Sequence, residues 1–231
     1  MAMDYCNSAI VLAAGSGSRM HSDVPKQYME LMGHPIIYYT LKAFEESNVD
    51  EVVLVVRDGD VEYVKKEIVD VYGFTKVTSI VIGGSTRTES VYNGIQAAKG
   101  EYVLIHDGAR CFVSKELINK MVLEVKNGSC IAAVPSKDTI KISDEEGYVS
   151  ETPSRDLVWV IQTPQAFNKK KLIWAYGKIN LLTESKKSKL TDDSMIMEYV
   201  GEKVRLIPAE YSNIKVTTPE DMLFGKNLIK K

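Results

Sequence analysis

Near its start the sequence reads Ala9-Ile10-Val11-Leu12-Ala13-Ala14-Gly15-Ser16-Gly17-Ser18-Arg19-Met20, a short apolar run followed at once by a turn of small residues. The run is too short for a helix and suits a strand covered on both faces. In an open α/β sheet, ligands bind at the edge where such strands end. Small residues there let backbone N–H groups approach a phosphate closely. The stretch therefore predicts a strand of an α/β sheet and, at its end, a candidate phosphate site.

Further runs rich in Val and Ile follow, with amphipathic stretches between them. The expected strands cover residues 9–12, 51–56, 77–82, 102–105 and 131–134, and the expected helices cover 35–47, 60–72, 86–99 and 115–127. Thr86 and Glu89 have the spacing of a capping box at the start of one helix. Such alternation predicts βαβ units and hence an α/β fold with a Rossmann-like, mainly parallel, doubly wound sheet.

The alternation breaks after residue 135. Residues 139–143 alternate as a strand does, 145–147 read as a turn, and 148–152 can run back. We expect one domain over 1–231 and, within it, an arm over 136–160 that projects as a β-hairpin. Two interpretations of the arm stay open, a plain surface excursion and a dimer clasp.

Composition narrows the function classes. The chain has 231 residues, 45% of them hydrophobic and 26% charged, and a formal net charge of −2. Nucleic-acid binding relies on a basic face, so this balance argues against a nucleic-acid partner. The apolar run near the start is too short to span a bilayer, so no membrane partner is expected. Three cysteines without metal or redox spacing favour buried thiols in the cytoplasm.

The opening turn has the spacing G-x-G-x-R. A dinucleotide fingerprint needs a third glycine, where Met20 stands, and the P-loop pattern is absent. Arg19 and Lys26 are cations that can flank the turn and stabilise charge on a triphosphate. A tight turn beside two solvated cations is the simpler alternative.

Two later segments follow expected strands. Gly83, Gly84 and Ser85 can approach a base or ribose, and Ser90 can bond a base edge; a plain turn explains them equally well. Asp107 at the end of residues 102–105 can hold Mg²⁺, and Arg110 can hold an acceptor phosphate. The alternative for these two is an ion pair beside a loop.

Lys215 lies in residues 213–217, which we expect to form an otherwise uncharged strand that ends near an anion. The other polar candidates are Thr139 and Arg155, at the two sides of the arm, and Thr191 at a helix start. Thr191 can also serve as a capping residue.

Together these segments resemble one family, the 2-C-methyl-D-erythritol 4-phosphate cytidylyltransferases. The matching motifs, in family order, are Ala13-Ala14-Gly15-Ser16-Gly17-Ser18-Arg19-Met20, Pro25-Lys26-Gln27-Tyr28, Gly83-Gly84-Ser85-Thr86-Arg87, His106-Asp107-Gly108-Ala109-Arg110, Lys137-Asp138-Thr139-Ile140-Lys141, Gln162-Thr163-Pro164-Gln165 and Asn213-Ile214-Lys215-Val216-Thr217. The resemblance implies transfer of CMP from CTP to 2-C-methyl-D-erythritol 4-phosphate, which gives 4-diphosphocytidyl-2-C-methyl-D-erythritol and pyrophosphate for isoprenoid precursor synthesis by the non-mevalonate pathway.

The resemblance also implies roles. The catalytic set would be Arg19, Lys26, Lys215 and Asp107, with Asp107 beside Mg²⁺ or another divalent cation. The nucleotide would contact Ala13, Ala14, Gly15, Ser16, Gly17, Gly83, Gly84, Ser85 and Ser90. The acceptor would contact Arg110, Thr139, Arg155, Thr191 and also Lys215, with Thr139 and Arg155 reaching across a homodimer because the family's arm crosses to a second subunit.

Four residues depart from the family pattern: Ser85, Cys111, Pro153 and Ser154. These departures weaken the match to the family at the nucleoside contact and around Arg155. Ribitol 5-phosphate stays open as the acceptor, although the 137–141 stretch and Trp159 favour methylerythritol phosphate. A nicotinamide-dependent dehydrogenase is disfavoured, since the third glycine is missing and no acid ends the second strand. A noncatalytic nucleotide-binding module is the remaining alternative.

Overall fold

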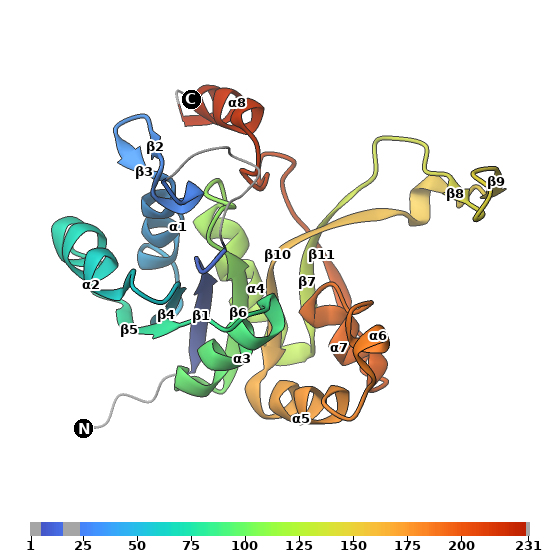
Figure 1. The fold of residues 1–231 in the computed structure, drawn as a ribbon, viewed down its shortest axis with the longest axis horizontal. Helices are drawn as coiled ribbons and strands as arrows, with labels where there is room; N and C mark the ends of the chain where they lie inside the picture. Colours follow the sequence, from blue (N-terminus) through green and yellow to red (C-terminus); the bar gives the residue numbers. More distant parts are fainter. Residues whose placement is uncertain (1–5, 16–23, 230–231) are drawn as a thin grey trace.

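A central sheet of seven strands organises the chain in the computed structural model, which describes residues 6–15 and 24–229 (Figure 1). In chain order the strands are β1 (Asn7–Leu12), β4 (Glu51–Val56), β5 (Val77–Ile82), β6 (Tyr102–Asp107), β7 (Cys130–Pro135), β10 (Trp159–Asn168) and β11 (Arg205–Pro208). Their spatial order is β11-β7-β10-β6-β1-β4-β5. The strands β1, β4, β5 and β6 pair in parallel, as does β11 with β7, so the predicted mainly parallel α/β sheet is confirmed.

The five predicted strands are all present in the central sheet, and its two other strands, β10 and β11, were not foreseen. β10 inserts between β6 and β7 and runs antiparallel to both. Its register on β7 shifts between Ile161 and Gln165. The sequence hides this strand because polar Gln162 and Thr163 and the proline Pro164, which has no N–H to donate, interrupt its apolar pattern.

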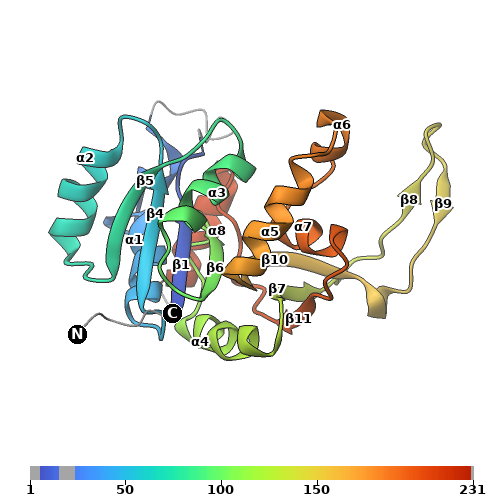
Figure 2. The same ribbon diagram turned by 90° about the horizontal axis from the view of Figure 1, so that it is seen from below.

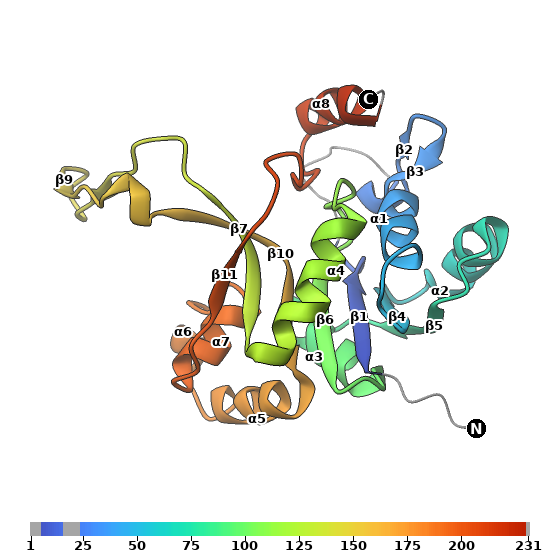
Figure 3. The same ribbon diagram turned by 180° about the vertical axis from the view of Figure 1, so that it is seen from behind.

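Helices cover both faces of the sheet, as Figures 2 and 3 show. One face packs on α1 (Ile36–Glu45), α2 (Val61–Tyr63) with its π-helical continuation Val64–Asp70, and α4 (Lys115–Glu124) with a 3-10 turn at Val125–Asn127. The other face packs on α3 (Arg87–Ala97), α5 (Lys169–Ile179) and α7 (Asp193–Tyr199). The sheet is therefore wound on both sides, and two hydrophobic clusters, one on each face, form the core.

A smaller apolar cluster lies at the edge of the sheet where the parallel strands end. It joins the hairpin of β2 (Glu30–Leu31) and β3 (His34–Pro35) to α8 (Pro219–Ile229). Leu31, Cys111 and Val216 are buried in it. Phe112 packs so closely on Gly225 that a Cβ at this glycine would lie 2.6 Å from the ring. This contact holds α8 beside the segment that leads out of β6.

The predicted projecting hairpin is present. Its strands are β8 (Ile142–Ser143) and β9 (Val149–Glu151), and they extend well away from the body (Figures 1 and 2). The two limbs leave the sheet next to Ser136, whose N–H donates to the Val158 carbonyl over 2.8 Å. Apolar side chains on the arm are exposed, including Tyr148 at 73% and Leu157 at 81%.

The remaining short helix is α6 (Glu184–Lys187). Over residues 6–15 and 24–229, none of the helices combines the length and the apolar character needed to cross a bilayer.

Candidate active site

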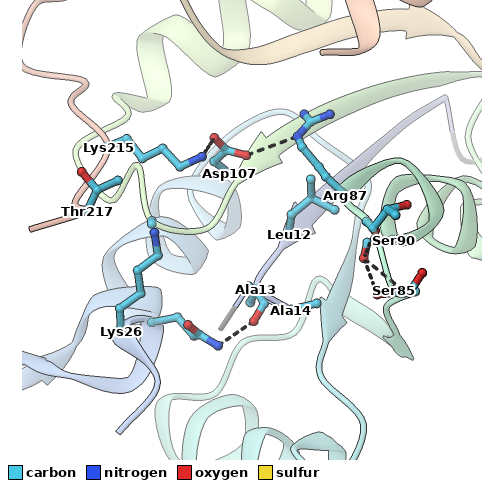
Figure 4. Close-up of a pocket in the computed structure, with 15 residues that line it drawn as sticks. Leu12, Ala13, Ala14, Lys26, Ser85, Arg87, Ser90, Asp107, Lys215 and Thr217 are labelled. Atoms are coloured by element: carbon cyan, nitrogen blue, oxygen red, sulfur yellow. Dashed lines mark hydrogen bonds and ion pairs between the residues drawn. The ribbon is translucent and has the colours of Figure 1, made fainter. Parts of the chain in front are cut away.

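A cavity of about 460 Å³ opens where β1 and β6 end (Figure 4). Two loops from different βα units face each other across it, and a third segment from near the C-terminus covers one side. Its lining is Leu12, Ala13, Ala14, Gly15, Lys26, Gln27, Gly84, Ser85, Thr86, Arg87, Ser90, Asp107, Ala109, Lys215 and Thr217. The sheet topology thus brings together residues that are distant in sequence, at the edge where ligands of such folds bind.

Lys26 reaches this cavity from a short 3-10 turn, Lys26–Tyr28, that follows the glycine segment. Gln27 is buried and donates from Nε2 to the Ala13 carbonyl over 2.7 Å, which ties this turn to the end of β1. Ala13, Ala14 and Gly15, which we predicted to contact the nucleotide, line the cavity. Ser16, Gly17 and Arg19 lie outside the described residues.

The loop after β5 forms the opposite wall. Thr86 caps α3 by accepting from the Glu89 N–H over 3.1 Å, which confirms the first half of the predicted capping box. The Glu89 carboxylate accepts from the N–H and the hydroxyl of Ser85, each over 2.7 Å. These bonds lower the pKa of Glu89 and fix the loop.

Glycine is required at position 83 of this loop because space is lacking. A Cβ at Gly83 would lie 2.7 Å from both the Ala14 Cβ and the Ser90 Oγ. Ser90 is itself occupied, since its hydroxyl donates to the Thr86 carbonyl over 2.9 Å and accepts from the Gly84 N–H over 3.1 Å. The two loops are thus packed against each other through small residues.

Three basic side chains surround the Asp107 carboxylate at the floor of the cavity. Its Oδ2 lies 2.7 Å from Lys215 Nζ, and its Oδ1 lies 3.9 Å from Arg87 Nε (Figure 4). The same Oδ2 lies 4.0 Å from Arg110 Nε. Burial alone would raise the pKa of this carboxyl group, but the charges of Lys215 and Arg87 outweigh that effect and lower it to about 2. Asp107 is therefore an anion at every physiological pH.

Lys215 enters the cavity differently from our expectation. Residues 213–217 form no strand, so that part of the prediction was wrong. The segment is held by the Val216 N–H, which donates to the Ala109 carbonyl over 2.8 Å. Asn213 donates from Nδ2 to Gln162 Oε1 over 2.8 Å and to the Thr163 carbonyl over 2.9 Å. The otherwise uncharged run around Lys215 has the sequence pattern of a strand, but residues 213–217 join no strand ladder.

Arg110 turns toward a neighbouring cavity of about 410 Å³, which Lys215 also lines. Its Nη1 donates to the Asn213 carbonyl over 2.9 Å, and burial lowers the pKa of the guanidinium. Lys137 lines the same space and its Nζ lies 3.7 Å from the Tyr211 ring centroid. This second cavity, at the base of the arm, therefore carries positive charge beside the first.

His106 has no role at the surface of the site. It is completely buried, with Nδ1 3.0 Å from Thr163 Oγ1 and Nε2 3.2 Å from the Arg110 carbonyl. Burial lowers its pKa to about 4. It therefore belongs to the frame behind Asp107.

Three predicted acceptor contacts lie away from both cavities. Thr139 and Arg155 are exposed on the arm, and Thr191 is exposed just before Asp192, the N-cap of α7. None of the three is among the residues that line either cavity. Within one copy of the chain, the structure therefore does not bring them to the Asp107 site.

Sequence reasoning gave no role to Arg87, although it stands in a motif that we singled out. Arg87 begins α3 and lines the cavity. The available signal was its place immediately after a cap residue at the end of a strand and loop, where a side chain faces the ligand edge of the sheet.

A divalent cation has one candidate ligand here. Over the described residues, no group of three or more His, Cys, Asp or Glu side chains could hold a metal. Mg²⁺ commonly uses one or two carboxylates and takes its other ligands from phosphate and water. Among the described residues, the closest ion-pair partner of Asp107 Oδ1 is Arg87 Nε at 3.9 Å, longer than a hydrogen bond. This oxygen fits such a shared site.

Comparison with known proteins gives a consistent picture. The family model for 2-C-methyl-D-erythritol 4-phosphate cytidylyltransferase matches residues 8–231. The enzyme of that name from Alkaliphilus oremlandii is 47% identical over 227 residues, covering 96% of this chain and 94% of the relative. That from Lachnoclostridium phytofermentans is also 47% identical over 227 residues, covering 97% and 96%.

A solved structure agrees over the same length. The 4-diphosphocytidyl-2C-methyl-D-erythritol synthase from Anaerococcus prevotii superposes with a TM-score of 0.86 at 39% identity, covering 98% of this chain and 97% of that one. The likeness thus extends over nearly the whole length of both chains.

Proposed function

Because this chain belongs to the 2-C-methyl-D-erythritol 4-phosphate cytidylyltransferase family and transfers CMP from CTP to that acceptor, we propose that the cavity around Asp107 is where the transfer occurs. The observation that carries the assignment is that Lys26 and Lys215 approach the same cavity from opposite ends of the sequence, with Asp107 between the loops (Figure 4). Membership of the family also identifies the acceptor as 2-C-methyl-D-erythritol 4-phosphate, where the sequence alone left ribitol 5-phosphate as an alternative.

In the proposed reaction, a phosphate oxygen of the acceptor attacks the α-phosphorus of CTP in line. One P–O bond forms there, the bond to the β-phosphate oxygen breaks, and pyrophosphate leaves with the electron pair. A phosphate monoester has a second pKa of ~6 and is already largely dianionic at neutral pH. No general base is needed, which suits a site whose histidine, His106, is buried.

Catalysis in this site then consists of positioning and charge stabilisation. Lys26 would neutralise charge that develops on the α-phosphate and the leaving pyrophosphate. Ala14 and Ser90 line the cavity and would border the cytidine, and Gly83 would let these two residues pack closely behind it. Arg19 is assigned beside Lys26 from the family motif alone.

We assign the acceptor phosphate to Lys215, which lines both cavities, and the remainder of the acceptor to the space beside Arg110. Arg155 and Thr139 would complete that space from the arm of a second copy. The exposed apolar side chains of the arm support this homodimer, since such groups are usually covered. Thr191 would lie at the rim.

We also assign a divalent cation, Mg²⁺ in the first place, to Asp107 together with the phosphates of CTP. When bound, it would supply positive charge to the triphosphate. Asp107 is ready for this role because its pKa of about 2 keeps it ionised. Cytoplasmic residence fits the three cysteines, Cys6, Cys111 and Cys130, which form no disulfide.

Pyrophosphate release tests the site. The wild-type protein is supplied with CTP and 2-C-methyl-D-erythritol 4-phosphate, with and without Mg²⁺, and compared with Lys215→Met. We expect loss of turnover in the variant while it stays folded. A Lys215→Met variant with the wild-type kcat would remove this cavity from the reaction, and ribitol 5-phosphate serves as the acceptor control.

A further inference from the structure

Asp193 is a buried carboxylate that the reaction above does not use. Its side chain is fully buried at the first residue of α7. Oδ2 lies 2.8 Å from Arg87 Nη2, and Oδ1 accepts from the Tyr176 hydroxyl over 2.6 Å. An ionised carboxylate is kept inside a protein only when it is paired. Arg87 is that partner, and Arg87 lines the cavity.

The position of Asp193 is itself fixed by the motif at 162–165. Gln165 donates from Nε2 to Asp192 Oδ2 over 2.9 Å and accepts on Oε1 from the Ser194 N–H over 3.1 Å. Gln165 also pairs with Ile105, two residues before Asp107. The helix start that carries Asp193 is thereby locked to the strand that ends in Asp107.

The same motif holds the other side of the site. Thr163 accepts on Oγ1 from the Asp107 N–H over 3.1 Å, and its carbonyl accepts from Asn213, two residues before Lys215. One strand, β10, therefore sets the positions of Asp107, Lys215 and Asp193. Asp192 already caps α7, so Asp193 is not needed for that purpose.

Arg87 connects the residues that β10 positions to the loop after β5, residues 83–86, which we call the nucleotide loop. It is the first residue of α3, directly after the cap Thr86. Its guanidinium lies between two carboxylates, 2.8 Å from Asp193 and 3.9 Å from Asp107. Burial would lower the pKa of this guanidinium, but the charges of Asp193 and Asp107 raise it above its ordinary value. The arginine is thus held as a cation in a single place.

We propose that Asp193 is a positioning residue that acts through Arg87, holding the nucleotide loop and Asp107 in register so that CTP and the acceptor meet in line. This inference rests on the proposed function of the cavity. Without the Asp193 charge, Arg87 has one carboxylate left to pair with, Asp107, and it would draw closer to that group. The loop and the floor of the cavity would then shift relative to each other.

A purely structural ion pair would affect folding without changing the kinetics of the folded enzyme. The two roles separate in a double-mutant cycle with Asp193→Asn and Arg87→Met, in which kcat, KM for CTP and thermal midpoints are measured for each single variant and for the pair. Asparagine keeps the acceptor for Tyr176 and removes only the charge. The double variant avoids an unpaired buried carboxylate and remains informative if Arg87→Met alone folds poorly.

A matched control is Glu51→Gln. Glu51 is also fully buried and has a lysine partner, Lys99 Nζ at 3.7 Å, but it lies outside the cavity lining. We expect it to lower the thermal midpoint and leave kcat at the wild-type value.

For Asp193→Asn we expect a fall in kcat of about tenfold, with KM for CTP changed less than about threefold. Because Asp193 acts through Arg87, the double variant should be no slower than Arg87→Met. A wild-type kcat in Asp193→Asn, or effects of the two substitutions that multiply in the double variant, would overturn the proposal. Lys215→Met, assayed in parallel, reports separately on the cavity, since its failure to lose activity would contradict the proposed function instead.

Discussion

Gln27 donates a hydrogen bond to the Ala13 carbonyl over 2.7 Å and is almost fully buried. The bond fastens the turn that carries Lys26 to the end of β1, across the glycine segment that separates them in sequence. The lysine is thus presented by a rigid element, as preorganised charge stabilisation requires.

Replacing Lys26 by alanine should therefore lower kcat far more than it raises KM for CTP. A preorganised donor of this kind contributes about 3–4 kcal/mol to the transition state, so we expect a loss of several hundredfold in kcat. Steady-state kinetics at saturating acceptor measure it, with Gln27→Ala as a graded companion that should give a smaller loss in the same direction. A rise in KM with an intact kcat would instead assign Lys26 to ground-state binding.

Substituting Gly83 by alanine should weaken CTP binding. The new Cβ would lie 2.7 Å from the Ala14 Cβ and the Ser90 Oγ, so the two loops must separate where the nucleoside is assigned. We expect the Kd for CTP, measured by calorimetry, to rise by about tenfold, a change typical of a small clash in a packed region.

Gly177→Ala provides the matched control. Gly177 lies within α5 with open space at its Cβ position. Alanine there should raise the free energy of unfolding by about 0.5–1 kcal/mol and leave the Kd for CTP unchanged. Equal Kd values for the Gly83 and Gly177 variants would contradict the packing argument.

Hydrophobic pattern and local chemistry predict the parallel half of this sheet because its strands are short, apolar and bounded by caps. The cap at Thr86 is an example, since a threonine three residues before Glu89 carries a local signal. β10 carries none. Its membership in the sheet depends on pairing with β6 and β7, which lie far away in the sequence, and its polar residues serve the site instead of the core.

The residues of the site likewise divide into those with a local sequence signal and those whose place depends on distant contacts. Asp107 and Lys26 could be selected from their places after strands and turns, and the structure places both in the lining of one cavity. Lys215 also lines the cavity, but its segment is held by single hydrogen bonds and not by a strand ladder. Asp193 could not be chosen, because its ion pair with Arg87 forms only when the fold brings the start of α7 to the start of α3.

Acid should destabilise the protein through His106. The unfolded imidazole has a pKa of about 6.5, whereas burial lowers the folded value to about 4. Between these values the unfolded chain binds the proton and the native chain does not, so the free energy of unfolding falls as pH drops from 6.5 to 4. The contribution amounts to about 3 kcal/mol at full development.

Urea unfolding at several pH values measures this contribution as the difference between the wild type and His106→Gln. Carboxyl groups titrate in both proteins and cancel in the difference. We expect the two curves to converge as pH falls through this window, because only the wild type loses the histidine contribution. Parallel curves from pH 6.5 to 4 would show that the imidazole titrates with its ordinary pKa in the native state.

Mixed dimers test the role of the arm. Thr139 and Arg155 are exposed and lie outside both cavities of their own chain, whereas Lys26 and Lys215 line one cavity together. If the arm completes the site of a second copy, Lys26→Ala and Arg155→Ala damage different halves of each site. Co-expression at equal levels then gives hybrids with one intact site, and about a quarter of all sites work in a twofold-symmetric dimer.

The pair Lys26→Ala and Lys215→Met is the control for this mixture, because both lesions fall in the same half. Every site of its hybrids retains one lesion, so no activity should return. Pyrophosphate release is measured for both mixtures against their separate parents. Recovery in the first mixture alone places Arg155 in the partner's site, while equal behaviour of the two mixtures would return Arg155 to its own chain or remove it from the site.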